Sequence, residues 1–372
     1  QVKGLREYGI DVSNASLQQY ALSKGIDLTV RNMNQAQKSV LRYNYILEKS
    51  VNIQGDMART IATPSNALRI LNAKMEKLKI GDTIGFIAPS YKAKREPIER
   101  AAENLRKLGY KVKFAKNLFS TTNVYAGSIE ERAEDFNSMI ADPEVKMLFF
   151  TGGEVGNEIL PFIDYENIKK NPKIICSYSD STTVLNAVNH MTGLVTFYGS
   201  SPRFFENGPT DYTLVNFEKR LKSNDLEYVK NSEWRVLTPG KAEGILVGGY
   251  LMNFAALLGL EWYRELPDED IILFIEDHEK FSNASVVSKW FTTLEHHGVF
   301  KKAKALIFGH YSLEPSPVID DILTRIGKRY NIPVIRNEDF GHGVNGAILP
   351  ISIRAKLDTE TLSFEFLDSG VE

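Results

Sequence analysis

The sequence NPKIICSYSDSTTVLNAV, at residues 171–188, runs from an apolar segment into a helical one. Its first part, which ends at Tyr178, is short, apolar and preceded by a proline, as is typical of a buried strand. The part that begins at Ser181 is typical of a helix. Ser179 and Asp180 stand in the turn between them, so this stretch predicts one strand–helix unit of an α/β fold.

The residues before this stretch show the same alternation of strands and helices. We expect helices at 97–108 and 129–140, and strands in three apolar segments: TIGFIAPS at 83–90, KVKFAKNL at 111–118 and VKMLFF at 145–150. Such an alternation predicts a parallel sheet covered on both faces, with the active site at the carboxyl ends of its strands. Two loops fall at such ends, Thr151–Gly156 and Tyr178–Asp180.

The pattern changes after Pro202. Residues 206–238 are polar, and we interpret them as a connecting region. Short apolar runs follow, and the pair at 349–355 and 362–367 flanks a turn at 358–361 that is typical of a hairpin. We therefore expect a parallel-sheet domain at 75–205 and a β-rich C-terminal domain at 239–372.

Residues 1–74 differ in character from the rest of the chain. They carry a net charge of +5 against −7 for residues 75–372, and they contain neither Trp nor Phe. Apolar residues near helical spacing predict an amphipathic helix at 34–48, and Ser13 and Asn14 look like the cap of a shorter helix. We interpret this segment as a helical extension that cannot bury much core alone.

The overall composition is that of a folded protein, with 43% hydrophobic and 25% charged residues. A net charge of −2 gives no electrostatic argument for binding nucleic acid or a membrane surface. The single cysteine, Cys176, rules out an internal disulfide and suits a reducing compartment, so we expect a cytoplasmic protein.

Ser179 is a candidate nucleophile because a serine in a sharp strand-to-helix turn points its hydroxyl out of the sheet. The amide of the next residue, Asp180, then lies at a helix N-terminus, where it can stabilise an oxyanion. The alternative is that Ser179 and Asp180 only cap the helix, and the residues alone favour this alternative. A similar choice exists at Gly152 and Gly153, whose amides either complete an oxyanion hole or simply allow a tight turn.

Glu276 and His342 are the candidate partners of this serine. Glu276 ends the apolar run IILFIE, where a buried carboxylate needs a partner, and His342 lies in the loop sequence DFGHGVNG. His278 and His310 also follow strand ends, so position alone does not select His342. The sequence has neither an HExxH motif nor a cysteine cluster, and we expect neither a metal nor another cofactor.

Together these segments resemble the serine LD-carboxypeptidase family, and within it the microcin C self-immunity branch. The resemblance covers about residues 77–370. It rests on the following motifs, in chain order: GDTIGFIAPS, AGSIEERAEDFNSMIADPEVK, TGGEVGNEILPFIDYENIKKNPKIICSYSDSTTVLNAV, TGLVTFYG, GGYLMN, LFIED and DFGHGVNGAILPISIRAKLD.

The resemblance implies a Ser179–Glu276–His342 catalytic triad and an oxyanion hole formed by the amides of Asp180 and Gly153, with Gly152 as the alternative to Gly153. It also implies a flavodoxin-like nucleophile domain and a smaller, barrel-like C-terminal domain that contributes Glu276 and His342. The implied assembly is a homodimer. The implied substrate is a small peptide or a peptidyl-nucleotide.

Three positions depart from the family pattern. Ser177 replaces a glycine two residues before the nucleophile, and we expect its side chain to crowd the turn. GGYLMN replaces GGNL, so Tyr250 stands where the family has an asparagine. FYGSSP replaces FYGP, which inserts Ser200 and Ser201 in a loop near the site.

Residues 8–72 resemble part of a phage tail tape-measure protein, which implies a scaffold or interaction role. Three functions therefore remain open. The first is hydrolysis of a microcin C-type aminoacyl-nucleotide, favoured because TGGEVGN lacks the RGGYG of cell-wall recycling enzymes. The second is carboxypeptidase action on murein tetrapeptides, and the third is a phage-tail interaction protein with an inert peptidase-like domain.

Overall fold

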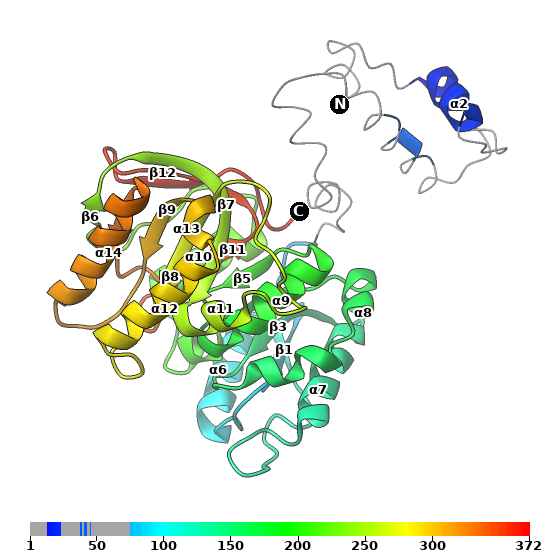
Figure 1. Cartoon of the computed structure of the whole chain (residues 1–372). Coiled ribbons are helices and arrows are strands. Elements are labelled where there is room, and N and C mark those ends of the chain that lie inside the picture. Colours follow the sequence, from blue (N-terminus) through cyan, green and yellow to red (C-terminus); the bar gives the residue numbers. More distant parts are fainter. Residues whose placement is uncertain (1–12, 24–37, 39–40, 43–44, 46–74) are drawn as a thin grey trace. The chain divides into compact units, whose positions relative to one another are not determined.

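The structure is a computed structural model that describes residues 13–23, 38, 41–42, 45 and 75–372 (Figure 1). The chain divides into two compact units, Gln1–Leu71 and Asn72–Glu372. In the first unit, helix α2 spans Asn14–Ser23, and the Ser16 amide donates to Ser13 Oγ at 3.3 Å, which confirms the predicted cap. Most of the predicted helix at 34–48 lies outside the described residues.

The first sheet of the second unit is parallel, as the strand–helix alternation predicted. Within residues 75–372 its order is β11-β5-β4-β3-β1-β2, and every pair is parallel except β11 with β5. Its strands are β1 (Thr83–Ile87), β2 (Lys111–Phe114), β3 (Val145–Phe150), β4 (Ile174–Ser177), β5 (Thr196–Tyr198) and β11 (Leu349–Ile351). The last strand comes from the far end of the chain, so the C-terminal segment is part of this sheet.

Helices α6 (Arg95–Lys107), α7 (Ile129–Ala141), α8 (Tyr165–Lys170) and α9 (Thr182–Thr192) connect these strands. Local sequence signals explain their limits. A capping box of Ser128 and Glu131 starts α7, and glycines with positive φ follow α6 and α9, at Gly109 and Gly193. The predicted helices at 97–108 and 129–140 are therefore confirmed to within two residues.

The segment after β5 contains a 3-10 turn at Pro202–Phe205, and the connecting region that follows it contains helix α10 (Asp211–Phe217) and a π-helical turn at Glu218–Lys222. Aromatic residues of both pack on the first sheet, since the rings of Phe205 and Phe217 lie 5.9 and 6.2 Å from that of Phe149. This contact makes the region part of the core.

The second sheet has the order β13-β12-β7-β8-β9-β10-β6 within residues 75–372. Its strands are β6 (Arg235–Thr238), β7 (Lys241–Tyr250), β8 (Ile271–Glu276), β9 (Ala303–Phe308), β10 (Val334–Arg336), β12 (Arg354–Asp358) and β13 (Ser363–Phe366). The last two strands form a hairpin, but its first strand is Arg354–Asp358 and not the predicted 349–355, because Leu349–Ile351 pairs with β5 in the first sheet. The four strands from β7 to β10 are parallel, so their carboxyl ends meet at one edge.

Helices α11 (Leu251–Leu257), α12 (Ala284–His296), α13 (Val299–Lys302) and α14 (Pro317–Tyr330) connect these parallel strands. Only strands were predicted in this part of the chain. In α12, however, the buried residues Val287, Phe291 and Leu294 follow a helical period. The predicted class, a parallel α/β sheet followed by a second sheet-based part, is confirmed. Among the residues described, no helix is long and apolar enough to cross a membrane.

Candidate active site

The backbone at Ser179 has an unusual conformation. Strand β4 ends at Ser177, and Ser179, with a φ of +61°, is the first residue of a 3-10 turn that leads into α9. A serine rarely adopts a left-handed conformation, and such strain is concentrated at functional sites. The conformation is that of a nucleophile elbow, and the Ser179 hydroxyl contacts a histidine instead of capping the helix.

The structure brings Ser179, His342 and Glu276 together from three distant segments. Ser179 Oγ lies 2.8 Å from His342 Nε2, and His342 Nδ1 lies 2.8 Å from Glu276 Oε2. Because an ionised carboxylate can only accept, His342 Nδ1 carries the proton, and Nε2 is left to accept from the Ser179 hydroxyl. Glu276 is fully buried, whereas the His342 side chain is 10% exposed. Solvent therefore reaches the Ser179–His342 end of this row of three hydrogen-bonded residues, whereas Glu276 is shielded from it.

Tyr198, at the end of β5, joins two members of this row. Its hydroxyl donates to Glu276 Oε1 at 2.5 Å and accepts from the Ser179 amide at 3.2 Å. Burial, together with the charge of Glu276, raises the pKa of Tyr198 well above its ordinary value, so the hydroxyl remains a donor. This role of Tyr198 was not predicted from the sequence. The available signal was the motif TGLVTFYG, in which Tyr198 ends the next strand after the one that precedes Ser179.

The other histidines at strand ends are engaged elsewhere. His310 Nδ1 pairs with Glu338, and His278 Nδ1 accepts from the Lys280 amide at 3.0 Å. The His278 ring contacts both His310 and His342, at 5.4 and 5.6 Å between ring centroids. Tertiary geometry therefore selects His342, which sequence position had left undecided.

Aromatic rings surround His342. The rings of Tyr178, Tyr250, and Phe281 lie 5.3, 5.0 and 5.8 Å from it. Tyr250 is buried, whereas Phe281 is 58% exposed and stands beside the imidazole at the surface. These contacts restrict the orientation of His342.

The glycine loop lies against the turn that carries Ser179. Ser90 Oγ accepts from the amides of Glu154 and Val155 at 2.9 Å each, and the Gly156 amide donates to Asp180 Oδ2 at 2.9 Å. Burial raises the pKa of Asp180 to about 6, although the Gly156 amide, Ser90 and Asn253 all favour its ionised form. The loop and the turn are therefore held together by Ser90 and Asp180.

The two candidate glycines of this loop differ in their surroundings. A Cβ on Gly153 would lie 2.0 Å from Ser90 Oγ, so no side chain fits there. A Cβ on Gly152 would meet no atom within 4 Å. Packing therefore requires glycine only at position 153, and the surroundings of Gly152 are open.

The residues that depart from the family pattern fit into the structure. Ser177 is buried and donates to Ser181 Oγ at 2.8 Å, so its side chain has a place beside the turn. Tyr250 is the register partner of Glu276 across β7 and β8, which places this substitution next to the triad carboxylate. Ser200 and Ser201 are both buried after β5.

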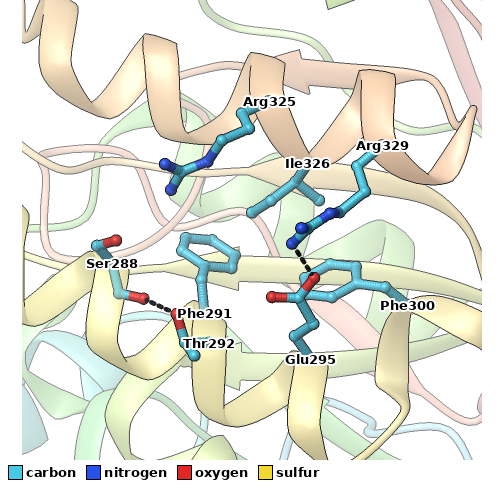
Figure 2. A pocket seen from close by; sticks show the side chains of 8 residues that line it. All are labelled: Ser288, Phe291, Thr292, Glu295, Phe300, Arg325, Ile326 and Arg329. Atoms are coloured by element: carbon cyan, nitrogen blue, oxygen red, sulfur yellow. Dashed lines mark hydrogen bonds and ion pairs between the residues drawn. The ribbon is translucent and has the colours of Figure 1, made fainter.

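A separate cavity lies between α12 and α14 (Figure 2). Its volume is about 310 Å³, and Arg329 on its rim pairs with Glu295 at 2.6 Å. It contains none of the candidate site residues. In the described part of the chain, no group of three His, Cys, Asp or Glu side chains is placed to hold a metal ion.

Comparison with known proteins identifies the class. Residues 84–199 match the LD-carboxypeptidase N-terminal domain, and residues 243–357 match the LD-carboxypeptidase C-terminal domain. The microcin C7 self-immunity protein MccF of Escherichia coli is 33% identical over 76% of this chain and 92% of its own. A probable murein peptide carboxypeptidase of Bacillus subtilis is 30% identical over 78% of this chain and 92% of its own.

Solved structures agree with these relatives. MccF in complex with glutamyl sulfamoyl guanosine has a TM-score of 0.73 at 27% identity, covering 80% of this chain and 99% of its own. The muramoyltetrapeptide carboxypeptidase from Oxalobacter formigenes has a TM-score of 0.66 at 26% identity, covering 76% of this chain and 97% of its own.

The chain therefore belongs to the LD-carboxypeptidase family, and it is a serine-type carboxypeptidase. The resemblance to the branch that contains MccF is confirmed. Neither family match includes residues 8–72, so the resemblance of that stretch to tape-measure proteins has no support from them.

Proposed function

We propose that the chain hydrolyses a small peptide-like amide with Ser179 as nucleophile, His342 as general base and Glu276 as the carboxylate that orients it. The observation that carries this proposal is the continuous row of hydrogen bonds from Ser179 Oγ through the imidazole to Glu276. Each member comes from the end of a strand or the loop after it, where catalytic residues of α/β folds lie. The same row argues against an inert peptidase-like domain.

In this mechanism His342 Nε2 takes the Ser179 proton as the hydroxyl attacks the amide carbonyl. The imidazolium that forms is stabilised by Glu276 and then gives its proton to the leaving nitrogen. A water molecule, activated by His342 in the same way, releases the acyl group from Ser179. Tyr198 keeps Glu276 in place during both steps through its bond to Oε1.

The oxyanion would be held by the amide of Asp180 and that of Gly153, with Gly152 as the alternative. The proximity of the two loops supports this proposal, because the Gly156 amide bonds directly to the Asp180 carboxylate. Each donor of this kind is worth roughly 3 kcal/mol in the transition state.

For the substrate we propose an aminoacyl-nucleotide of the microcin C type. Solved MccF structures hold glutamyl sulfamoyl guanosine and aspartyl sulfamoyl adenosine, and the loop TGGEVGN differs from the RGGYG of cell-wall enzymes. The second candidate is a murein tetrapeptide, because relatives at 30% and 22% identity are named for action on murein peptides. We also propose that the protein is cytoplasmic and a homodimer.

A side-by-side assay tests the substrate. The full chain is incubated with an aspartyl-sulfamoyl nucleotide and with a murein tetrapeptide, and mass spectrometry identifies the products. We expect release of the sulfamoyl nucleoside at a kcat/KM at least tenfold above that for the tetrapeptide. Cleavage of the tetrapeptide alone would assign the cell-wall function. Cleavage of neither, with Ser179 unreactive toward a serine-directed probe, would overturn the enzymatic proposal.

A further inference from the structure

A group of buried polar atoms lies behind the candidate triad. Within residues 75–372, Asp277 Oδ2, Tyr250 OH and Ser282 Oγ are buried and have no hydrogen-bond partner at normal distance. Buried polar atoms are normally paired, since leaving one unpaired costs about 1–3 kcal/mol. Three such atoms in one place therefore suggest a common role.

The three residues are neighbours of the triad and of one another. Asp277 follows Glu276 directly at the end of β8, and the Tyr250 ring lies 5.0 Å from that of His342. The pKa of Tyr250 is raised first by burial and then by the charges of Asp277 and Glu276, and Ser282 shifts the pKa of both Tyr250 and Asp277. The register of β7 and β8 pairs Tyr250 with Glu276, and the Ser282 amide donates to the His278 carbonyl at 3.0 Å, so both residues lie close to Asp277.

Asp277 has one oxygen committed and one available. Its Oδ1 accepts from the His278 amide at 2.7 Å, whereas Oδ2 lacks a partner among the described residues. Burial, followed by the nearby charge of Glu276, raises the pKa of Asp277 to about 7. A proton on Oδ2 makes this carboxyl a donor toward the two hydroxyls.

We propose that Asp277, Tyr250 and Ser282 act as positioning residues, together making one buried polar group that fixes the His342 ring and controls the charge beside Glu276. This inference rests on the proposed function. When Asp277 is neutral, Glu276 alone of these two neighbouring residues carries a negative charge, and it stabilises the imidazolium of His342. When Asp277 ionises, a second negative charge favours protonated His342, which cannot act as a base.

Several other groups define the electrostatic surroundings of Asp277. The titratable groups that face it come from its own strand, the end of β7, the segment after β9 and the loop after β10: Glu276, His278, Tyr250, His310, Tyr311 and His342. His278 has a lowered pKa, first because of its burial and then because of the neighbouring His342 and His310, so it remains neutral at neutral pH.

The test compares Asp277→Asn with Asp277→Ala in the full chain. Asparagine keeps an acceptor for the His278 amide and a donor toward the hydroxyls, so we expect kcat at pH 6 to stay within threefold of wild type. The acid limb of the kcat/KM profile should move to lower pH by about half a unit, because Asp277, whose pKa is about 7, no longer adds a negative charge beside His342 at the upper end of that limb. Alanine should lower kcat at least tenfold with KM nearly unchanged.

Asp135→Asn is the matched control, since Asp135 is also buried and also has a pKa raised by burial, but it lies on α7. The acid limb of the kcat/KM profile of Asp135→Asn should coincide with that of wild type. If Asp277→Ala does not fold, Tyr250→Phe removes a single oxygen and should still lower kcat severalfold at constant KM. An unmoved acid limb in Asp277→Asn, or full kcat in Tyr250→Phe, would overturn the proposal.

Failure of the triad itself gives a different result. If Ser179→Ala kept its activity, the proposed function would fall whatever Asp277 does. If Ser179→Ala is inactive and the Asp277 variants behave as wild type, the triad stands and only the supporting group is refuted.

Discussion

At the scale of single residues, the backbone conformation of Ser179 differs from that of a serine that caps a helix. A capping serine has an extended backbone and bonds to an amide two or three positions later. Ser179 instead has a φ of +61° and contacts His342. Such a strained conformation persists only when surrounding contacts hold it, and the Tyr198 hydroxyl that accepts from the Ser179 amide is one of them.

Replacing Ser179 by alanine tests the nucleophile. We expect kcat on any cleaved substrate to fall by about 10³-fold or more, because the covalent step is lost. The thermal unfolding midpoint should stay close to that of wild type, since the hydroxyl contributes only its bond to His342. Ser181→Ala, two positions along the same turn, is the control for local disturbance. An alanine variant that keeps a tenth of the activity would refute the assignment.

Asp180 predicts a pH dependence of stability. Its pKa is about 6 in the folded protein and 3.8 ordinarily, so between these values the folded chain holds a proton that the unfolded chain has lost. Protons bound by the folded state alone make the free energy of unfolding fall as the pH rises. The contribution is fully present below about pH 4, declines up to about pH 6 and is constant above it.

The variant Asp180→Asn isolates this contribution. The unfolding midpoint of wild type minus that of the variant should decrease from pH 4 to pH 6 and then level off. Scanning calorimetry at four pH values measures it. A difference that stays constant over this range would show that the pKa of Asp180 is not shifted, and one that increases would show that it is lowered.

At the scale of elements, Ser90 in the loop after β1 holds the loop after β3 in place. Ser90 binds two amides of this loop through one hydroxyl and occupies the space where a side chain on Gly153 would stand. Of the two adjacent glycines, Gly153 has no room for a side chain and Gly152 has room for one, a difference that the sequence Thr-Gly-Gly does not reveal.

This difference predicts unequal effects of two alanine substitutions. Gly153→Ala should lower stability by about 1–3 kcal/mol and reduce activity, because the loop must move away from Ser90. Gly152→Ala adds a methyl group to open surroundings and should keep stability within about 0.5 kcal/mol. The double variant Gly153→Ala/Ser90→Gly should recover part of the lost stability. Equal effects of the two single substitutions would contradict the packing described.

At the scale of the whole molecule, the enzyme unit begins near residue 72. Met75 is buried in its core, and the Met75 carbonyl accepts from the Glu372 amide at 2.9 Å. Both family matches fall within Asn72–Glu372, and so does every candidate site residue.

We therefore expect residues 72–372 alone to be a complete catalyst. Its kcat/KM should stay within about twofold of the full chain, and its unfolding should be a single transition. Starting at Asn72 keeps the bond between Met75 and Glu372, whereas starting at Lys79 removes it and serves as the comparison. A soluble but inactive 72–372 fragment would show that the first segment contributes to the site.

The first sheet and its functional turn were predictable from sequence because strand and helix periods are local properties. Apolar runs alternate with helical segments from Thr83 to Thr192, and the polar turn at Ser179 falls between two of them. Glu276 and His342 were named through the family resemblance, since the residues alone left His278 and His310 as alternatives.

Only the tertiary structure settled which side chains meet. Tyr198, at the end of β5, bonds to Glu276, at the end of β8, although the two strands belong to different sheets, and Tyr250 pairs with Glu276 through the register of β7 and β8. Asp277 lies beside the triad for the same reason. Strand order and register between segments about 30 to 160 residues apart depend on long-range packing, which no local pattern of residues encodes.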